Sequence, residues 1–137
     1  MATSNKLISV QHLVKEYNHG TVKALNDCNL DIAQGEVVAI IGPSGSGKST
    51  LLRSLNLLEE PTSGQIFFDG VNLADKSVDI NLHRQKMGMV FQQFNLFNNM
   101  NVMHNLTAAP TRIKGMDKEQ AEAKALQLLG RVGLADR

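Results

Sequence analysis

The sequence has little that would tie it to an oxidising compartment, a bilayer interior or a nucleic acid. Its 137 residues include one cysteine, Cys28, so no disulfide can form within the chain, which indicates a reducing compartment. The longest apolar run, Val37–Ile41, is far too short to span a bilayer. Residues 1–6 lack the apolar core of a signal peptide. With 14 basic and 13 acidic residues, the chain has no basic field to hold nucleic acid through its phosphates.

The N-terminal part is rich in β-branched residues and leucine, and it predicts two strands. These strands cover residues 7–14 and 22–32, and the turn at 17–20 between them predicts an antiparallel hairpin. The next apolar segment, Val37–Ile41, shows no alternation with polar residues. A strand covered on both faces has this pattern, so we expect Val37–Ile41 to form a central strand of a parallel sheet.

A helical pattern follows in the next segment. We expect a helix that begins inside the loop after Ile41 and ends near Glu60–Pro61. The leucines at helical spacing are Leu51, Leu52, Leu55 and Leu58. A turn is expected at 62–64, and short strands are expected at 66–68 and 89–91.

The C-terminal part has a helical pattern from Asn101 onward. Asp117 is expected to be the N-cap of the last helix, and Gln120 three residues later resembles the second half of a capping box. Gly133 suits the C-terminal end of that helix. Its expected apolar face comprises Ala121, Ala125, Leu128 and Val132.

The segment Gly42–Ser49 carries a chemical motif, because it matches the pattern G-x-x-x-x-G-K-[ST]. Its glycines permit backbone angles that turn successive N–H groups inward as an anion nest. The following helix adds unpaired N–H groups and the positive end of its dipole. Lys48 is expected to reach the β- and γ-phosphates of ATP, and the Ser49 hydroxyl to ligate Mg²⁺. The expected phosphate-binding residues are Gly42, Ser44, Gly45, Ser46, Gly47, Lys48, Ser49 and Thr50.

This phosphate loop does not by itself distinguish ATPases from GTPases or small-molecule kinases, but its surroundings do. The stretches GPSGSGKSTLLRSLNLLEEPTSGQIFFDG, GMVFQQFNLF and NLTAAPTRIKGM resemble the ATP-binding subunits of ABC transporters. They are most similar to the importer branch that serves polar amino acids, and the resemblance covers nearly the whole chain. It implies an α/β P-loop NTPase fold of the ABC ATPase type. An antiparallel β subdomain is then expected at about 1–34, a phosphate-loop core at about 35–95 and the start of a helical subdomain at 96–137.

The same resemblance implies roles for residues outside the phosphate loop. Tyr17 matches the aromatic residue that stacks on adenine, and Val22 matches a residue that packs beside the adenine ring. Gln92 matches the glutamine of the Q-loop, which contacts Mg²⁺ and the attacking water. Residues 94–103 match the surface that receives the coupling helix of the membrane subunits. From the residues alone, Phe94, Leu96 and Phe97 could equally belong to a core.

The resemblance also implies cofactors, partners and a location. ATP and Mg²⁺ would be bound, membrane-spanning permease subunits would be partners, and a second ATP-binding subunit would complete a dimer. The protein would then lie in the cytoplasm, on the inner face of the cell membrane. The four histidines show no metal-ligand spacing and are expected not to bind metal. They are His12, His19, His83 and His104.

The family pattern continues beyond Arg137. The signature motif, the Walker B acidic residue, the catalytic glutamate and the switch histidine are not among these 137 residues. We therefore expect these residues to represent the N-terminal half of a subunit, and we expect them to lack ATPase activity on their own. Two alternatives stay open: a nucleotide-binding module without turnover, and an ABC ATPase of another process such as DNA repair.

Overall fold

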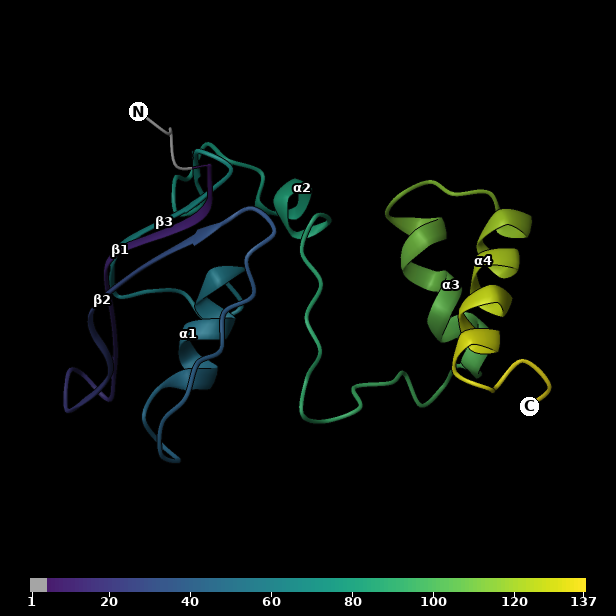
Figure 1. Ribbon diagram of the computed structural model, residues 1–137, viewed down its shortest axis with the longest axis horizontal. Coiled ribbons are helices and arrows are strands. Elements are labelled where there is room, and N and C mark those ends of the chain that lie inside the picture. Colours follow the sequence, from purple (N-terminus) through teal and green to yellow (C-terminus); the bar gives the residue numbers. More distant parts are fainter. Residues whose placement is uncertain (1–4) are drawn as a thin grey trace. The chain divides into compact units, whose positions relative to one another are not determined.

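The computed structural model describes residues 5–137, which divide into two compact units (Figure 1). The first unit ends at Met89, and the second is Val90–Arg137. The first contains all the strands and two helices, α1 and α2. The second contains the helices α3 and α4.

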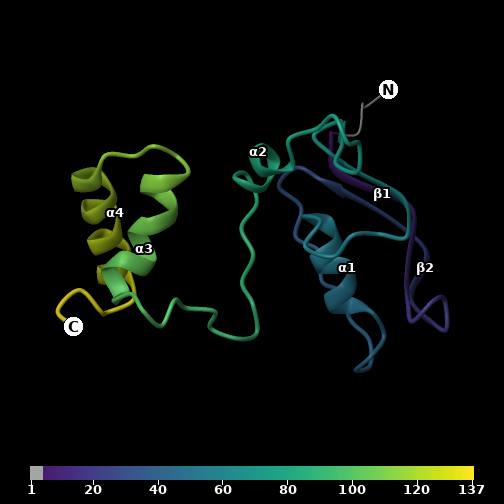
Figure 2. The ribbon, with the colours of Figure 1, turned by 180° about the vertical axis from the view of Figure 1, so that it is seen from behind.

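The first unit is built on an antiparallel hairpin, as its sequence predicts. Strand β1 (Lys6–Tyr17) pairs with β2 (Val22–Ala33). Strands β3 (Ser63–Phe68) and β4 (Val71–Asn72) complete a sheet of order β2-β1-β3-β4, in which every pairing is antiparallel. Figure 2 shows this sheet from behind, with α1 beside it.

Strand β1 contains a bulge that changes which residues face the core. Against β3, Gln11 pairs with Gln65 and Val14 pairs with Ser63, so β1 carries one extra residue in this interval. The same extra residue appears against β2. At the bulge His12 has a φ of 50°. The bulge lets Val10 and Leu13 both lie in the core, although regular alternation would place residues three apart on opposite faces.

The core of the first unit lies between the sheet and α1 (Lys48–Leu55). Its buried side chains come from β1, β2, β3 and the segment after β4, and the half-buried Leu51 and Leu55 of α1 pack against them. The buried apolar residues are Val10, Leu13, Leu25, Ile66, Phe68 and Leu73. Two of the predicted helical leucines therefore face the core.

Helix α1 ends earlier than expected. Its last residue is Leu55, and Asn56 is the C-cap. Leu57 then adopts a positive φ of 56°, which cannot continue a right-handed helix. The expected end near Glu60–Pro61 is therefore wrong, and Leu58 lies outside the helix with an exposed side chain.

Two predicted strands do not form. Neither Val37–Ile41 nor 89–91 pairs with any strand among the described residues. A strand requires a hydrogen-bonded neighbour, and an apolar sequence cannot supply one. Val37 and Ile41 accordingly have exposed side chains, and so does Val90.

The short helix α2 (Ile80–Arg84) was not anticipated from the sequence. Asp79 caps it by accepting a hydrogen bond from the backbone N–H of Asn81 at 3.1 Å. Arg84 then donates to the carbonyl oxygens of Asn56 (2.9 Å) and Leu57 (3.1 Å). This guanidinium therefore ties α2 to the C-terminal end of α1 and satisfies carbonyls that the helix end leaves unpaired.

The second unit is a helical hairpin of α3 (Val102–Arg112) and α4 (Lys118–Arg131). Asn101 caps α3 by accepting a hydrogen bond from the His104 N–H at 2.8 Å, which confirms a helix beginning there. Asp117 is the N-cap of α4, but its side chain makes no capping hydrogen bond, so the predicted capping box with Gln120 is wrong.

The two helices pack through small buried residues. Ala121 and Ala125 of α4 are buried as predicted, and Thr107 is buried on α3. Leu128 and Val132 lie on the predicted apolar face but are exposed. Beyond the helix, Gly133 has a φ of 74°, and its N–H donates to the Gly130 carbonyl at 3.2 Å, so it ends the helix as predicted.

Candidate functional site

The phosphate loop adopts the turned conformation that its glycines allow. Gly45 and Gly47 have φ values of 80° and 97°, and the Ser46 N–H donates to the Pro43 carbonyl at 3.2 Å. Helix α1 begins at Lys48, and no side chain caps its first turn. The first N–H groups of α1 therefore lack side-chain partners and are available to a bound anion.

The loop is seated against strand β2. A Cβ atom added to Gly47 would lie 2.4 Å from the Ala24 carbonyl oxygen and 3.4 Å from the Leu25 side chain. Ala24 is the extra residue of a second bulge, since Lys15 pairs with Leu25 and Glu16 pairs with Lys23. Gly47 is thus required both by its positive φ and by this close approach of two backbone segments.

Lys48 is held by the loop itself. Its ammonium donates hydrogen bonds to the carbonyl oxygens of Gly42 (2.6 Å) and Pro43 (2.8 Å). It also lies 3.4 Å from the Ser46 hydroxyl oxygen. These contacts keep the charge at the mouth of the loop. A phosphate group bound there would offer the ammonium stronger, charge-assisted hydrogen bonds in place of the carbonyls.

The remaining loop residues differ in their exposure to solvent. Gly42, Ser44 and Ser49 are exposed. Thr50 is half-buried, and its carbonyl accepts a hydrogen bond from the buried Ser54 hydroxyl at 2.7 Å. The Ser49 hydroxyl is an exposed oxygen in the first turn of α1. A single protein oxygen fits Mg²⁺, which keeps waters and binds largely through substrate phosphates.

Tyr17 and Val22 lie opposite one another at the end of the hairpin. They are the last paired residues of β1 and β2, and Val22 is exposed. Val22 is two residues before Ala24, the residue that contacts Gly47. Two strand residues span about 7 Å, so the hairpin end and the phosphate loop lie within reach of one nucleotide. The structure thus brings together Tyr17, Val22 and the loop in one unit.

The Tyr17 ring has charged neighbours that sequence reasoning did not single out. The Lys15 ammonium lies over the ring, 5.1 Å from its centroid, and pairs with the Glu59 carboxylate at 3.2 Å. Hydrogen bonds from Tyr17 and then from Lys15 hold the pKa of Glu59 below its ordinary value. A lysine two residues before an aromatic residue on one strand was the available signal, since such residues share a face.

Gln92 lies in the second unit and is exposed. It comes directly after residues 89–91, where the expected strand does not form. The nearby apolar residues are on the surface, with Phe94 94% exposed, Leu96 63% and Phe97 60%. Of the two readings that the sequence left open for these side chains, the core is therefore wrong.

Asn105 of α3 organises the backbone that follows these apolar residues. Its side-chain oxygen accepts a hydrogen bond from the Phe97 N–H at 2.8 Å. Its amide nitrogen lies 3.2 Å from the Phe97 carbonyl oxygen, 3.1 Å from that of Met100 and 3.0 Å from that of Asn101. One side chain therefore ties both ends of the segment 97–101 to the first turn of α3.

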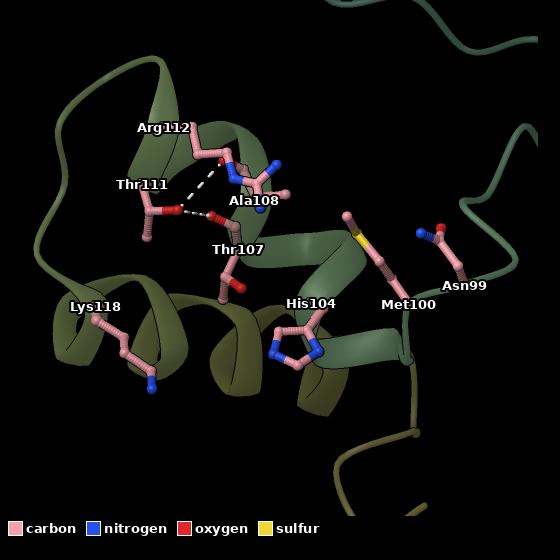
Figure 3. Close-up of a pocket in the computed structure, with 8 residues that line it drawn as sticks. All are labelled: Asn99, Met100, His104, Thr107, Ala108, Thr111, Arg112 and Lys118. Atoms are coloured by element: carbon pink, nitrogen blue, oxygen red, sulfur yellow. Dashed lines mark hydrogen bonds between the residues drawn. The ribbon is translucent and has the colours of Figure 1, made fainter.

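A pocket of about 400 Å³ lies within the second unit, and no residue pattern had pointed to it (Figure 3). The hydroxyls of Thr107 and Thr111 donate to carbonyls one turn earlier in α3, at 2.9 and 2.7 Å. Figure 3 shows Arg112 and Lys118 at the helix ends, and no acidic side chain is among the lining residues. The lining residues are Asn99, Met100, His104, Thr107, Ala108, Thr111, Arg112 and Lys118.

Neither a metal-binding cluster nor a membrane-spanning helix is found among the described residues. In residues 5–137 no three His, Cys, Asp or Glu side chains are grouped so that they could hold a metal ion. None of the helices in this part of the chain is long and apolar enough to cross a membrane.

Comparison with known families decides the assignment. A sequence profile described as ABC transporter matches residues 25–137. The chain belongs to the ABC transporter family. The match includes the phosphate loop and all of α3 and α4.

Curated ABC relatives with similar sequences are transport ATP-binding proteins. The glutamine transport ATP-binding protein GlnQ of Escherichia coli (strain K12) is 50% identical over 131 residues, which are 96% of this chain and 54% of GlnQ. The glutamate/aspartate import ATP-binding protein GltL of the same strain is 44% identical over 129 residues, 94% of this chain and 53% of GltL. The methionine import ATP-binding protein MetN of Helicobacter hepaticus is 45% identical over 132 residues, 96% of this chain and 37% of MetN.

Solved structures of ABC proteins share the fold. A dimeric ATP-binding cassette in a post-hydrolysis state, bound to ADP and Pi, has a TM-score of 0.78 and 35% identity, over 90% of this chain and 56% of that one. The protein cbiO1 from Clostridium perfringens, part of the ABC transporter complex cbiONQ, has a TM-score of 0.75 and 31% identity, over 95% of this chain and 51% of that one. The chain thus spans about half the length of these relatives.

Proposed function

We propose that the chain provides the nucleotide-binding part of an ABC importer ATPase that drives the uptake of polar amino acids. The observation that carries this proposal is the phosphate loop, which is seated by Gly47 on the hairpin that bears Tyr17. One compact unit then offers an anion nest and an aromatic ring to the two ends of ATP. The transport names of the similar proteins GlnQ and GltL support the importer role.

Each loop residue has a defined task in this proposal. Backbone N–H groups of Gly45, Gly47 and the first turn of α1 bind the β- and γ-phosphates. Lys48 leaves the Gly42 and Pro43 carbonyls and pairs with the phosphates. Ser44, Ser46 and Thr50 add polar contacts around them. Bound Mg²⁺ supplies charge neutralisation on the phosphate oxygens, and the Ser49 hydroxyl would be its ligand from this loop.

The hairpin end recognises the base. The Tyr17 ring stacks on adenine, and the exposed Val22 packs at its edge. Gln92 is proposed as the Q-loop residue that ligates Mg²⁺ and orients the attacking water during hydrolysis. The exposed apolar residues between Phe94 and Met103 are proposed to receive the coupling helix of the permease subunits.

The proposed assembly follows the same reasoning. A second ATP-binding subunit pairs with this one, as in the dimeric cassette bound to ADP and Pi. The permease subunits hold the dimer on the cytoplasmic side of the cell membrane. Polar amino acids are the proposed cargo, while the similarity to MetN makes methionine the cargo to compare.

Calorimetric titration of the chain with ATP and Mg²⁺ tests the nucleotide site, and we expect saturable binding that Lys48→Ala removes. Lys86→Ala is the matched control, because Lys86 is exposed and makes no ion pair within residues 5–137. Equal ATP affinity in the wild type and in Lys48→Ala would contradict the loop assignment.

The transport role has its own test. Uptake of labelled glutamine, glutamate and methionine is compared between cells with and without the gene. We expect the loss of glutamine or glutamate uptake on deletion, and its return when the wild-type gene but not the Lys48→Ala gene is restored. Unchanged uptake of all three amino acids would contradict the proposed cargo.

A further inference from the structure

Lys15 is bound on three sides at the end of β1. Its ammonium donates a hydrogen bond to the Glu60 carbonyl oxygen at 2.6 Å and pairs with the Glu59 carboxylate at 3.2 Å. It also lies over the face of the Tyr17 ring, 5.1 Å from the centroid. Its side chain is only 15% exposed, so the ammonium is directed inward rather than into solvent.

The segment that holds Lys15 is itself fixed. The Thr62 N–H donates to the Val14 carbonyl at 2.8 Å, and the Glu16 N–H donates to the Thr62 hydroxyl at 2.9 Å. The Glu59 N–H donates to the Arg53 carbonyl of α1 at 3.2 Å. Lys15 therefore connects the Tyr17 ring to a segment that is anchored to both β1 and the helix of the phosphate loop.

We propose that Lys15 is a positioning residue for adenine, acting through Tyr17. The inference rests on the proposed ATP site and adds a residue that selects adenine nucleotides over other polyphosphates. The ammonium covers one face of the ring, which leaves the opposite face to the base. The pairing of the same ammonium with Glu59 and the Glu60 carbonyl holds it at this position over the ring.

The physical basis is preorganisation. A tyrosine ring that is already held in one orientation loses less conformational freedom when a base stacks on it. A cation over the ring face favours that orientation through the ring quadrupole. Removing the ammonium should therefore weaken ATP binding by about 2- to 12-fold, which corresponds to the cost of ordering one side chain.

The alternative is that Lys15 attracts the triphosphate by its charge alone. A direct ion pair with phosphate would weaken every polyphosphate equally, whereas positioning of Tyr17 affects only ligands that carry a base. The exposed Lys23 provides the matched control, because it lies on the same hairpin and pairs with Glu16 at 3.6 Å. Lys23→Met and Lys15→Met both remove one positive charge from the hairpin.

The experiment measures the dissociation constants of ATP and of inorganic tripolyphosphate by calorimetry. The proteins are the wild type, Lys15→Met, Lys15→Arg, Lys23→Met, Tyr17→Ala and the Lys15→Met/Tyr17→Ala double variant. We expect Lys15→Met to weaken ATP binding about 2- to 12-fold and tripolyphosphate binding by less than about 1.5-fold. Lys15→Arg and Lys23→Met should keep the ATP affinity, and Lys15→Met should have no further effect in the Tyr17→Ala background.

Three results would overturn the inference: unchanged ATP affinity in Lys15→Met, equal loss for both ligands, or the same loss with Tyr17 absent. If the wild type binds tripolyphosphate but Tyr17→Ala binds ATP normally, the proposed adenine site has failed rather than Lys15 alone.

A second readout does not depend on the affinity of any variant. Tyr17 is the only tyrosine and the chain has no tryptophan, so tyrosine fluorescence reports this ring alone. ATP should change that emission in the wild type and tripolyphosphate should not. An equal response to both ligands would contradict the stacking on which the inference depends.

Discussion

A Cβ atom on Gly47 would lie 2.4 Å from the carbonyl oxygen of Ala24. At this close approach the end of the phosphate loop packs against the bulge of β2. The position of the loop therefore depends on the sheet. The close approach also makes a testable distinction between two glycines of the loop, because Gly45 has a similar positive φ but open space around it.

Gly47→Ala should destabilise the first unit more than Gly45→Ala. Both variants place alanine in the left-handed region, which costs about 1–2 kcal/mol. Only Gly47→Ala also forces two backbone segments apart, and overpacking of this kind adds about 1–3 kcal/mol. Urea unfolding of both proteins measures the difference. Equal midpoints would show that the loop is not seated on Ala24.

Lys48→Ala should abolish or strongly weaken Mg-ATP binding without unfolding the chain. Charge-assisted hydrogen bonds of about 1.5–3 kcal/mol are lost, which corresponds to roughly 10- to 150-fold in affinity. The ammonium otherwise contacts only loop atoms: the carbonyls of Gly42 and Pro43 and the Ser46 hydroxyl. Circular dichroism melting should therefore shift little, and a large shift would mean that the variant tests folding instead of binding.

Tyr17→Ala should weaken ATP binding by about 5- to 150-fold, because base stacking on an aromatic ring is worth about 1–3 kcal/mol. Tyr17→Phe is the matched control. It keeps the ring but removes the hydroxyl that helps to lower the pKa of Glu59, and it should stay within a few-fold of the wild type. A loss of less than twofold in Tyr17→Ala would place the adenine elsewhere.

Asn105→Ala should loosen the segment 97–101 without melting α4. The variant loses the hydrogen bond from the Phe97 N–H and the contacts of the Asn105 amide with three carbonyls, so we expect a loss of about 1–2 kcal/mol. Hydrogen exchange at the Phe97 amide should speed up by roughly tenfold. Asn98→Ala is the control, since the Asn98 side chain makes no hydrogen bond within residues 5–137. Equal exchange in both variants would contradict this role.

The first unit should lose stability in acid. Hydrogen bonds from Lys6 and then Ser9 lower the pKa of Asp31 from its ordinary 3.8, and those from Tyr17 and Lys15 lower that of Glu59 from 4.5. A carboxylate with a lowered pKa contributes stability above its ordinary value, and this is lost as the pH falls through the folded value. Urea midpoints should therefore fall below about pH 4.5. Asp31→Asn should flatten this dependence, and an unchanged slope would contradict it.

The hairpin, α3, α4 and the phosphate loop followed from the sequence because local patterns determine them. The loop glycines, the Asn101 cap and the Gly133 helix end depend on backbone angles that a few neighbouring residues specify. Val37–Ile41 could not be settled in the same way. Its apolar pattern describes a strand that is covered and paired, and pairing depends on partners elsewhere in the chain.

The side-chain contacts of the site could not be predicted from the sequence for the same reason. Tyr17 and Lys48 could be named from motif and resemblance, but their contacts could not. The pairing of Lys15 with Glu59 joins residues 44 positions apart, and Arg84 reaches Asn56 at the end of α1 from 28 positions away. Such contacts arise only when the strand register and the helix end are both known, and a bulge changes the register in β1.

The extra residue at the His12 bulge sets which face of the sheet the later residues of β1 occupy, including the proposed base-binding Tyr17. Side chains alternate between the two faces of a strand, so removing one residue there would turn every later residue of β1 to the other face. A deletion of His12 would keep the core residue Val10 in place but turn Lys15 and Tyr17 together to the opposite face of the sheet, away from Glu59. Gly64 leaves room for this bulge, because a Cβ atom at residue 64 would lie 2.4 Å from the His12 carbonyl oxygen. In the proposed nucleotide site, the length of this strand therefore matters as much as the identity of its aromatic residue.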